Sequence, residues 1–277
     1  MNRNQILMLM GVVGIIVIGA VAYMLLGPTE EASAPIEAIP IVEQPTDEPE
    51  PTAEPEPTAE PEPTEEPVVE ESAYEADPTA EPEPTAEPEP TAEPVVESSP
   101  ITYAIVQAES QARFELDEEL QGNPVVVVGV TDQVAAQLLL NPNDLSTAQI
   151  GTVTINARTF VTDSDRRNQA IRNFVLNSDQ FEFIMFEPVS LVGLPDSVVE
   201  GDSAEFQIEG NLTIRDATLP VTFDASVSYS SPDRIEGAAA AIILYADYGI
   251  TVPDVPFVAN VEDELELYIE FAATPVE

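Results

Sequence analysis

The chain has 277 residues and a formal net charge of −44, and it contains no cysteine, histidine, tryptophan or lysine. These absences exclude disulfide bonds, zinc sites with nitrogen or sulfur ligands, and nucleophile pairs that need His, Cys or Lys. The charge disfavours nucleic-acid binding, because phosphates are neutralised by Lys and Arg. The charges are spread unevenly, and this divides the chain into residues 1–27, 28–100 and 101–277.

Residues 1–27 contain one arginine and no acid, and the 21 residues 6–26 carry no charge. Such a run is long enough to cross about 30 Å of hydrocarbon as a helix. Arg3 precedes the run and the next 73 residues contain no base. We therefore expect a single-pass cell-membrane protein with a cytoplasmic N-terminus and an extracellular or periplasmic C-terminal domain. A signal peptide cleaved after Ala20-Val21-Ala22 is the alternative, although the apolar run continues to Leu26.

Residues 28–100 hold 23 acids, 18 prolines and no base, and they repeat the sequence TAEPEP. Proline interrupts helices and sheet ladders, and the segment has little apolar surface to bury, so its composition predicts a disordered linker. At about 3.1 Å per residue the fully stretched segment reaches on the order of 200 Å, which would lift a domain clear of the membrane. A proline-rich recognition tract or a carrier of glycans is the alternative.

Residues 101–277 form the predicted folded domain, in which apolar and polar side chains alternate along several segments. Alternation at period two indicates half-buried strands. Residues 209–211 and 216–219 are the turns expected between three of these strands. The apolar positions that share one face are Ala112 and Phe114, Val153 and Ile155, Phe206 and Ile208, Leu212 and Ile214, Val221 and Phe223, and Leu267 and Ile269.

One amphipathic helix is predicted directly before a strand. Asp163 or Ser164 can accept hydrogen bonds from the amides at its start, and apolar residues then recur at three- and four-residue spacing. A strand that includes Phe183 on one face follows at 181–186, and Pro188 is expected to end it because proline lacks a ladder donor.

Three ordered stretches resemble the YceI-like family of periplasmic or secreted lipid-binding proteins. They are the helix and strand at 163–188, the hairpin GNLTIRDATLPVTF at 210–223, and DYGI at 247–250 followed by VEDELELYIEF at 261–271. The resemblance implies an all-β, antiparallel, lipocalin-like closed barrel of about eight strands, with a short helix near its mouth. The chain departs from the family pattern at Glu182, where the family has proline, and at Asp216, where it has glycine.

Two stretches are ambiguous from periodicity alone. Residues 125–140 are apolar on both faces, and residues 237–245 would pass for a helix on propensity. The resemblance assigns both to strands. Ala238 and Ala240 are then expected to face the lumen, where small side chains favour a cavity over a filled barrel.

The resemblance implies a binding protein and not an enzyme. We expect a membrane-tethered, extracytoplasmic protein that holds an elongated apolar ligand, of polyisoprenoid, quinone or fatty-acyl type, in the barrel lumen. Membrane contact is expected through residues 6–26, no nucleic acid is expected, and the oligomeric state, with a homodimer among the alternatives, is open. The lumen candidates are Ala112, Phe114, Val153, Ile155, Phe183, Phe223, Ala238, Ala240, Leu267 and Ile269.

Three arginines, Arg166, Arg167 and Arg172, lie on the predicted helix near the barrel mouth. A guanidinium group can bind the phosphate or another polar part of a lipid head group. The alternative is a polar helix face paired with neighbouring acids, which is common and contributes little.

The acidic clusters at 163–165 and 262–264 lack the twelve-residue spacing of an EF-hand, so we assign no metal and no cofactor. In a chain with 52 acids such clusters arise easily as solvated charge. Two other functions stay open: a surface-displayed structural or adhesion domain whose barrel is filled, and an enzyme with an acid pair. Empty volume along the barrel axis would distinguish a binding protein from a filled barrel.

Overall fold

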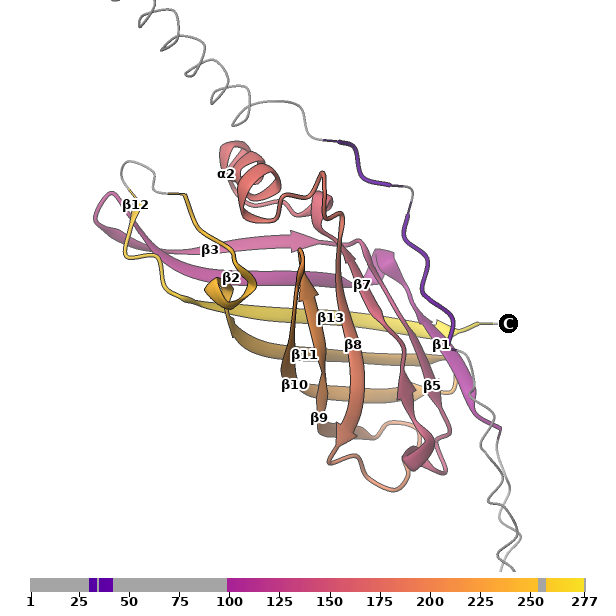
Figure 1. The fold of residues 1–277 in the computed structure, drawn as a ribbon. Helices are drawn as coiled ribbons and strands as arrows, with labels where there is room; N and C mark the ends of the chain where they lie inside the picture. Colours follow the sequence, from indigo (N-terminus) through magenta and orange to yellow (C-terminus); the bar gives the residue numbers. More distant parts are fainter. Residues whose placement is uncertain (1–29, 34, 42–98, 254–257, 277) are drawn as a thin grey trace, which may run out of the picture. The chain divides into compact units, whose positions relative to one another are not determined.

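The structure is a computed structural model that describes residues 30–33, 35–41, 99–253 and 258–276. The predicted span 6–26 and residues 42–98 of the predicted linker lie outside these ranges. Within them, no helix is long and apolar enough to cross a membrane. The described domain is mostly antiparallel β structure, with one short α-helix (Figure 1).

Most of the short strands and the helix lie in the first half of the domain, and most of the long strands lie in the second half. The early elements are β1 (Ile101–Ile105), β2 (Gln111–Leu120), β3 (Asn123–Thr131), β4 (Val134–Ala135), β5 (Gln137–Leu140), β6 (Gln149–Ile150), β7 (Val153–Asn156), α2 (Asp165–Ala170) and a π-helical turn (Ile171–Val175). The later strands are β8 (Phe183–Val192), β9 (Ser203–Ile214), β10 (Ala217–Ser231), β11 (Arg234–Leu244), β12 (Val258–Ala259) and β13 (Glu264–Pro275). Short 3-10 turns lie at Gln107–Glu109, Leu145–Thr147, Ala157–Thr159 and Tyr245–Tyr248.

The strands form one strongly curled antiparallel sheet in the order β4-β7-β8-β9-β10-β11-β13-β1-β5-β6, and β2 joins β13 to β3. The predicted all-β antiparallel class with a short helix is confirmed. The two ends of this order come from neighbouring stretches of chain, because β4 pairs with β7 while β5 pairs with β6. The predicted closure into a barrel of about eight strands stays a prediction.

The hairpin of β9 and β10 differs from the prediction. β9 runs through Gly210, so the turn expected at 209–211 is wrong, whereas the chain reverses at Arg215 and Asp216, at the beginning of the turn expected at 216–219. Gly210 is required for packing, because a Cβ there would lie 2.5 Å from the carbonyl oxygen of Glu187. The expected end of β8 at Pro188 is also wrong, since the strand continues across a register shift between Pro188 and Ser190.

The predicted strand at 237–245 is confirmed as part of β11, but its expected orientation is wrong. Ala239 is buried, whereas Ala238 is exposed and Ala240 lies on the same outer face. Directly paired residues share a face of a sheet. Ala239 pairs with Ile269, which faces the interior, so Ala239 faces the interior as well. A run of alanines cannot indicate this orientation from sequence.

The same error affects Phe183 in β8. Ile184 pairs with Ile155, and Phe186 pairs with Leu212, so Ile184 and Phe186 face the interior. Phe183 lies one residue out of phase and faces outward. Because residues 183–186 are all apolar, their alternation does not show which face is buried.

The helix begins as predicted. The hydroxyl of Ser164 accepts a hydrogen bond from the backbone N–H of Arg167, which caps the first turn of α2. The chain continues into the π-helical turn, where Ile171 and the following Leu176 are buried in the core. The apolar side of this helical region therefore packs against the curled sheet.

Residues 30–33 and 35–41, which we call the strap, form extended chain against the outside of the sheet (indigo in Figure 1). At the start of the strap, the carboxylate of Glu30 lies 2.8 Å from Arg158, and the N–H of Glu30 donates to Asp179. Ser33 donates to Glu182 through its N–H (2.6 Å) and its hydroxyl (2.8 Å). The prediction assigned these strap residues to a disordered linker, whereas the structure shows them bound to the domain.

Glu182 is the central acceptor for the strap. Burial acts to raise the pKa of its carboxyl, but the hydrogen bonds from Ser33 and Asn156 and the nearby charge of Arg158 lower that pKa below its ordinary value. Arg158 lies 3.0 Å from Glu182 and is itself nearly buried. The glutamate that departs from the family pattern is therefore the residue that binds the strap.

The close approach of Phe114 to Gly129 gives a test of the fold. The two residues are paired across β2 and β3, and a Cβ at position 129 would overlap the Phe114 ring. We expect Gly129→Ala to lower the free energy of unfolding by about 1–3 kcal/mol, as overpacking does, and Phe114→Leu in the same chain to restore part of it. Urea unfolding followed by circular dichroism measures both changes.

The control is Val128→Ala at the exposed neighbouring position, for which we expect a change within about 0.5 kcal/mol. An unchanged unfolding midpoint in Gly129→Ala would contradict the packing of Phe114 over Gly129.

Candidate functional site

The larger cavity of the domain has a volume of about 470 Å³ and lies inside the curled sheet, beneath α2. Strands β2, β3, β7, β8, β9, β10 and β13 contribute to its walls, together with the helical region and residues near 245–258. The lining side chains are apolar with few exceptions. Among the predicted lumen residues it contains Ala112, Phe114, Ile155, Phe223, Leu267 and Ile269.

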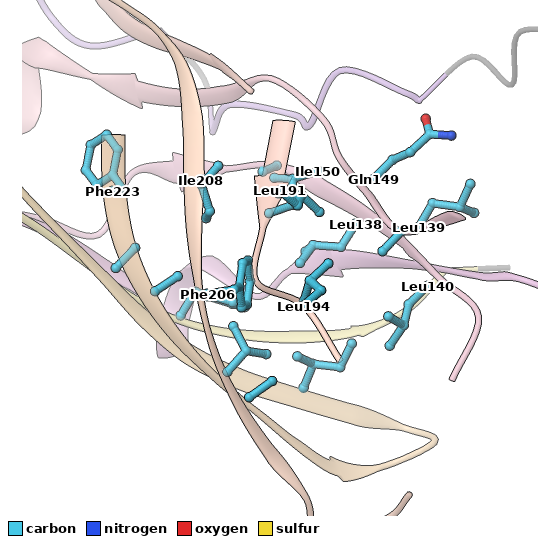
Figure 2. Close-up of a pocket in the computed structure, with 18 of the residues that line it drawn as sticks. Leu138, Leu139, Leu140, Gln149, Ile150, Leu191, Leu194, Phe206, Ile208 and Phe223 are labelled. Carbon is cyan, nitrogen blue, oxygen red and sulfur yellow. The ribbon is translucent and has the colours of Figure 1, made fainter. Parts of the chain in front are cut away.

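A smaller cavity of about 120 Å³ lies further along the interior (Figure 2). Leu138, Ile150, Leu191 and Phe206 are among the apolar side chains that line it. Val153, another predicted lumen residue, also belongs to its wall. A second apolar cluster around Tyr103, Tyr229 and Ile235 lies beside this cavity, and Tyr229 and Ile235 also line it.

The two cavities share a wall. Phe186, Phe223 and Ile269 line both of them. The rings of Phe186 and Phe223 meet edge to face, with their centroids 4.8 Å apart. This aromatic pair therefore separates two apolar chambers within one interior.

The larger cavity reaches the surface beside α2. Arg166 lines the cavity and is exposed, and no ion pair joins it to any residue in the described part of the chain. Arg167 also lines the cavity, but it pairs with Glu118 at 3.1 Å and with Asp163. Arg166 is therefore the cation best placed to meet an incoming ligand.

Two tyrosines of the turn after β11, Tyr245 and Tyr248, have pKa values raised above the ordinary value. Burial raises the pKa of Tyr245, which lines the larger cavity, and the charge of Asp263 and a hydrogen bond to it raise this pKa further. Burial, with a smaller effect from Asp247, raises the pKa of Tyr248 to about 12. The hydroxyl of Tyr245 can therefore act as an uncharged polar group at the cavity wall.

Seven of the ten predicted lumen residues line a cavity, and three do not. Phe183, Ala238 and Ala240 lie on the outer face, for the reasons of register given above. Arg172 of the predicted head-group candidates does not line either cavity, and its Nε is buried without a hydrogen bond in the described structure.

Several cavity residues were not predicted as lumen candidates. Phe186 and Ala239 were missed because their strands are apolar on both faces. Tyr245, Ile250 and Val252 were missed because they lie between strands, where period-two alternation does not apply. The remaining sequence signal that could have identified them as cavity residues was the apolar character of Ile250 and Val252.

The described ranges contain no group of three Asp or Glu side chains placed as a metal site requires. The predicted acidic cluster at 163–165 instead contributes Asp163 to the ion pair with Arg167. Glu118 is the one carboxylate among the described residues that line the larger cavity. The arrangement of these groups suits the binding of an apolar molecule with a small polar end.

The fold is similar to several solved bacterial structures, although the TM-scores lie below 0.5. BcnA of Burkholderia cenocepacia has 17% identity and a TM-score of 0.49, over 61% of this chain and 99% of BcnA. A domain of Saccharophagus degradans described as polyisoprenoid-binding has 12% identity and a TM-score of 0.49, and the match covers 64% of this chain and 99% of that domain. A YceI protein of Campylobacter jejuni has 16% identity and a TM-score of 0.44, and the match covers 54% of this chain and 85% of that protein.

No curated protein matches the chain. The model of one protein family, the YceI-like domain, matches residues 103–273, which are 171 of the 277 residues. This range contains all three stretches on which the resemblance was based. The chain therefore belongs to the YceI-like domain family.

Proposed function

We propose that this protein is a membrane-tethered, extracytoplasmic binding protein that holds an elongated apolar ligand, of polyisoprenoid, quinone or fatty-acyl type, inside the curled sheet. The observation that carries the proposal is the larger cavity, whose volume of about 470 Å³ falls in the range of about 300–1,000 Å³ typical of ligand sites. Its apolar walls exclude a charged ligand body.

The pairing of strands supports closure of the sheet into a lipocalin-like barrel of about eight strands. β4 and β5 are separated by one residue, and they pair with β7 and β6, which belong to one stretch of chain. The stretch 134–140 contains β4 and β5, and the stretch 149–156 contains β6 and β7, so each stretch contributes one strand to each end of the strand order. In a barrel of this size the interior either is filled or holds one slender ligand.

The energetics allow useful affinity. Burial of about ten methylene groups contributes roughly 8 kcal/mol before ordering costs, which corresponds to binding near the micromolar range when those costs are small. A filled barrel, the alternative structural or adhesion domain, would leave no comparable space. An acid-pair enzyme would need two converging carboxylates, whereas Glu118 is the single one among the described residues of the cavity wall.

We expect an organic extract of the purified full-length chain to contain an apolar molecule, because the walls of the larger cavity are mostly apolar. Mass spectrometry identifies the molecule. The absence of any such molecule, together with no uptake of added isoprenoid or fatty-acyl probes, would contradict the proposal and favour a filled barrel.

Ala239 and Ala240 offer a matched pair of variants, since they are adjacent and lie on opposite faces. Ala239→Phe should reduce the retained amount of a long-chain ligand by roughly tenfold, because the new ring occupies the smaller cavity and removes apolar contact area. Ala240→Phe adds the same ring outside the sheet and should leave retention unchanged. Equal retention in the two variants would show that the ligand does not enter the smaller cavity.

Arg166 is the proposed contact for a polar or anionic head group. Arg166→Glu should weaken binding of a fatty-acid probe by roughly tenfold, as expected for loss of a charge-assisted contact, and should leave binding of an uncharged isoprenoid probe unchanged. Titration of both probes measures the difference. Arg234→Glu, at the start of β11, is the control with the same change of charge, and an equal effect of both variants would contradict a local role for Arg166.

A further inference from the structure

The strap changes how residues 42–98 can act. The strap ends on β5, where the N–H of Ile41 donates to Gln137 at 3.0 Å. The chain re-enters the described domain on the same strand, because Ile101 of β1 pairs with Leu140. Gln137 and Leu140 are three residues apart, or about 10 Å along a strand. The described residues on either side of the proline-rich segment therefore both contact β5.

With the strap bound, the distance from a membrane span to the domain depends on very few residues. The predicted span ends at Leu26, and the described strap begins at Glu30. Four residue steps cover at most about 14 Å of extended chain. When the strap is bound, the 73 residues 28–100 therefore no longer set the distance between the domain and the membrane.

The beginning of the strap lies at the α2 end of the domain. Glu30 contacts Arg158 and Asp179, which lie seven residues before and four residues after the helical region 165–175. The larger cavity reaches the surface in this region, beside the exposed Arg166. The point of attachment and the cavity opening are therefore at the same end of the sheet.

Arginines are concentrated at this end, together with acids that pair with them, such as Glu30, Glu182, Glu118 and Asp163. Arg158 donates to the backbone oxygens of Ser178 and Asp179, and Arg215 donates to the carbonyl oxygen of Gly249 and lies over the Phe181 ring. Five of the seven arginines of residues 101–277 belong to this end: Arg158, Arg166, Arg167, Arg172 and Arg215. Arg166, which is exposed and forms no ion pair within the described residues, is the arginine of this group that can meet an anionic head group of a lipid bilayer.

We propose that the bound strap holds the α2 end of the domain against the surface of a lipid bilayer, so that an apolar ligand moves between the membrane and the larger cavity beside α2. This inference rests on the proposed function and on the predicted membrane span. The bound state replaces a domain raised on a long stalk with a domain whose opening faces its lipid source.

The test uses the full-length chain in vesicles that contain anionic lipid and a lipid with a head-group fluorescence quencher. Because the chain has no cysteine, a single introduced cysteine takes one fluorophore. Asp165→Cys places it on α2, and Asp233→Cys places it beyond the far end of β10, whose 15 residues span about 50 Å. We expect several-fold stronger quenching at 165 than at 233.

The strap is released by the double change Glu30→Arg and Ser33→Pro, which repels Arg158 and removes both donors to Glu182 without altering the sheet. Quenching at 165 and the rate of probe transfer from the vesicles should each fall roughly tenfold, because the effective tether lengthens. Glu37→Arg, at an exposed strap position, is the control with the same change of charge and should behave as the unchanged chain.

The outcomes separate this inference from the proposed function. A chain that retains an apolar molecule in its organic extract, but shows equal quenching at 165 and 233 or no effect of strap release, overturns the inference and leaves the proposed function standing. A chain recovered without its first 26 residues also overturns the inference. A chain that neither retains nor takes up any apolar molecule overturns the proposed function, whatever its orientation on the vesicle.

Discussion

Cross-strand pairing is the constraint on which the interior depends. In an antiparallel sheet, paired residues share a face, so once β13 turns Leu267 and Ile269 inward, Ala241 and Ala239 of β11 must follow. The same rule extends from β9 to β8 through Leu212 and Phe186. The cavity is therefore a property of the register of the whole sheet and not of any one strand, and a shift by one residue would exchange its lining with the solvent-facing side chains.

Much of the fold was predictable from the sequence where alternation was clear. In β2, β7 and β13 the polar face carries Glu, Thr or Asn, so the orientation of Phe114, Ile155 and Leu267 followed directly. In β8 and β11 both faces are apolar, and only the partner strand determines the orientation, which single-sequence periodicity does not contain. The turn expected at 209–211 failed for a related reason: Gly210 serves a close approach to β8 and not a reversal of the chain.

The strap shows what composition alone conceals. Residues 30–41 share the acid and proline content of the segment that follows, and this predicted disorder for the whole of 28–100. Their binding depends on particular acceptors and donors far away in sequence, above all Glu182 and Arg158. From the sequence, Glu182 indicated only the loss of the proline that the family pattern has at this position. In the folded domain its carboxylate, which the surrounding donors favour in the ionised form, accepts hydrogen bonds from the first residues to reach the sheet.

The aromatic pair between the cavities has a consequence for chain-length discrimination. A short apolar chain can occupy the chamber beneath α2 while the rings of Phe186 and Phe223 keep their edge-to-face contact. A longer chain must part those rings to advance, and an aromatic contact of this kind contributes about 0.5–1.5 kcal/mol beyond its buried area. Affinity should therefore rise with chain length until the chamber beneath α2 is full and then stay constant. It should rise again only when the added carbons in the second chamber contribute more than the lost contact between the rings.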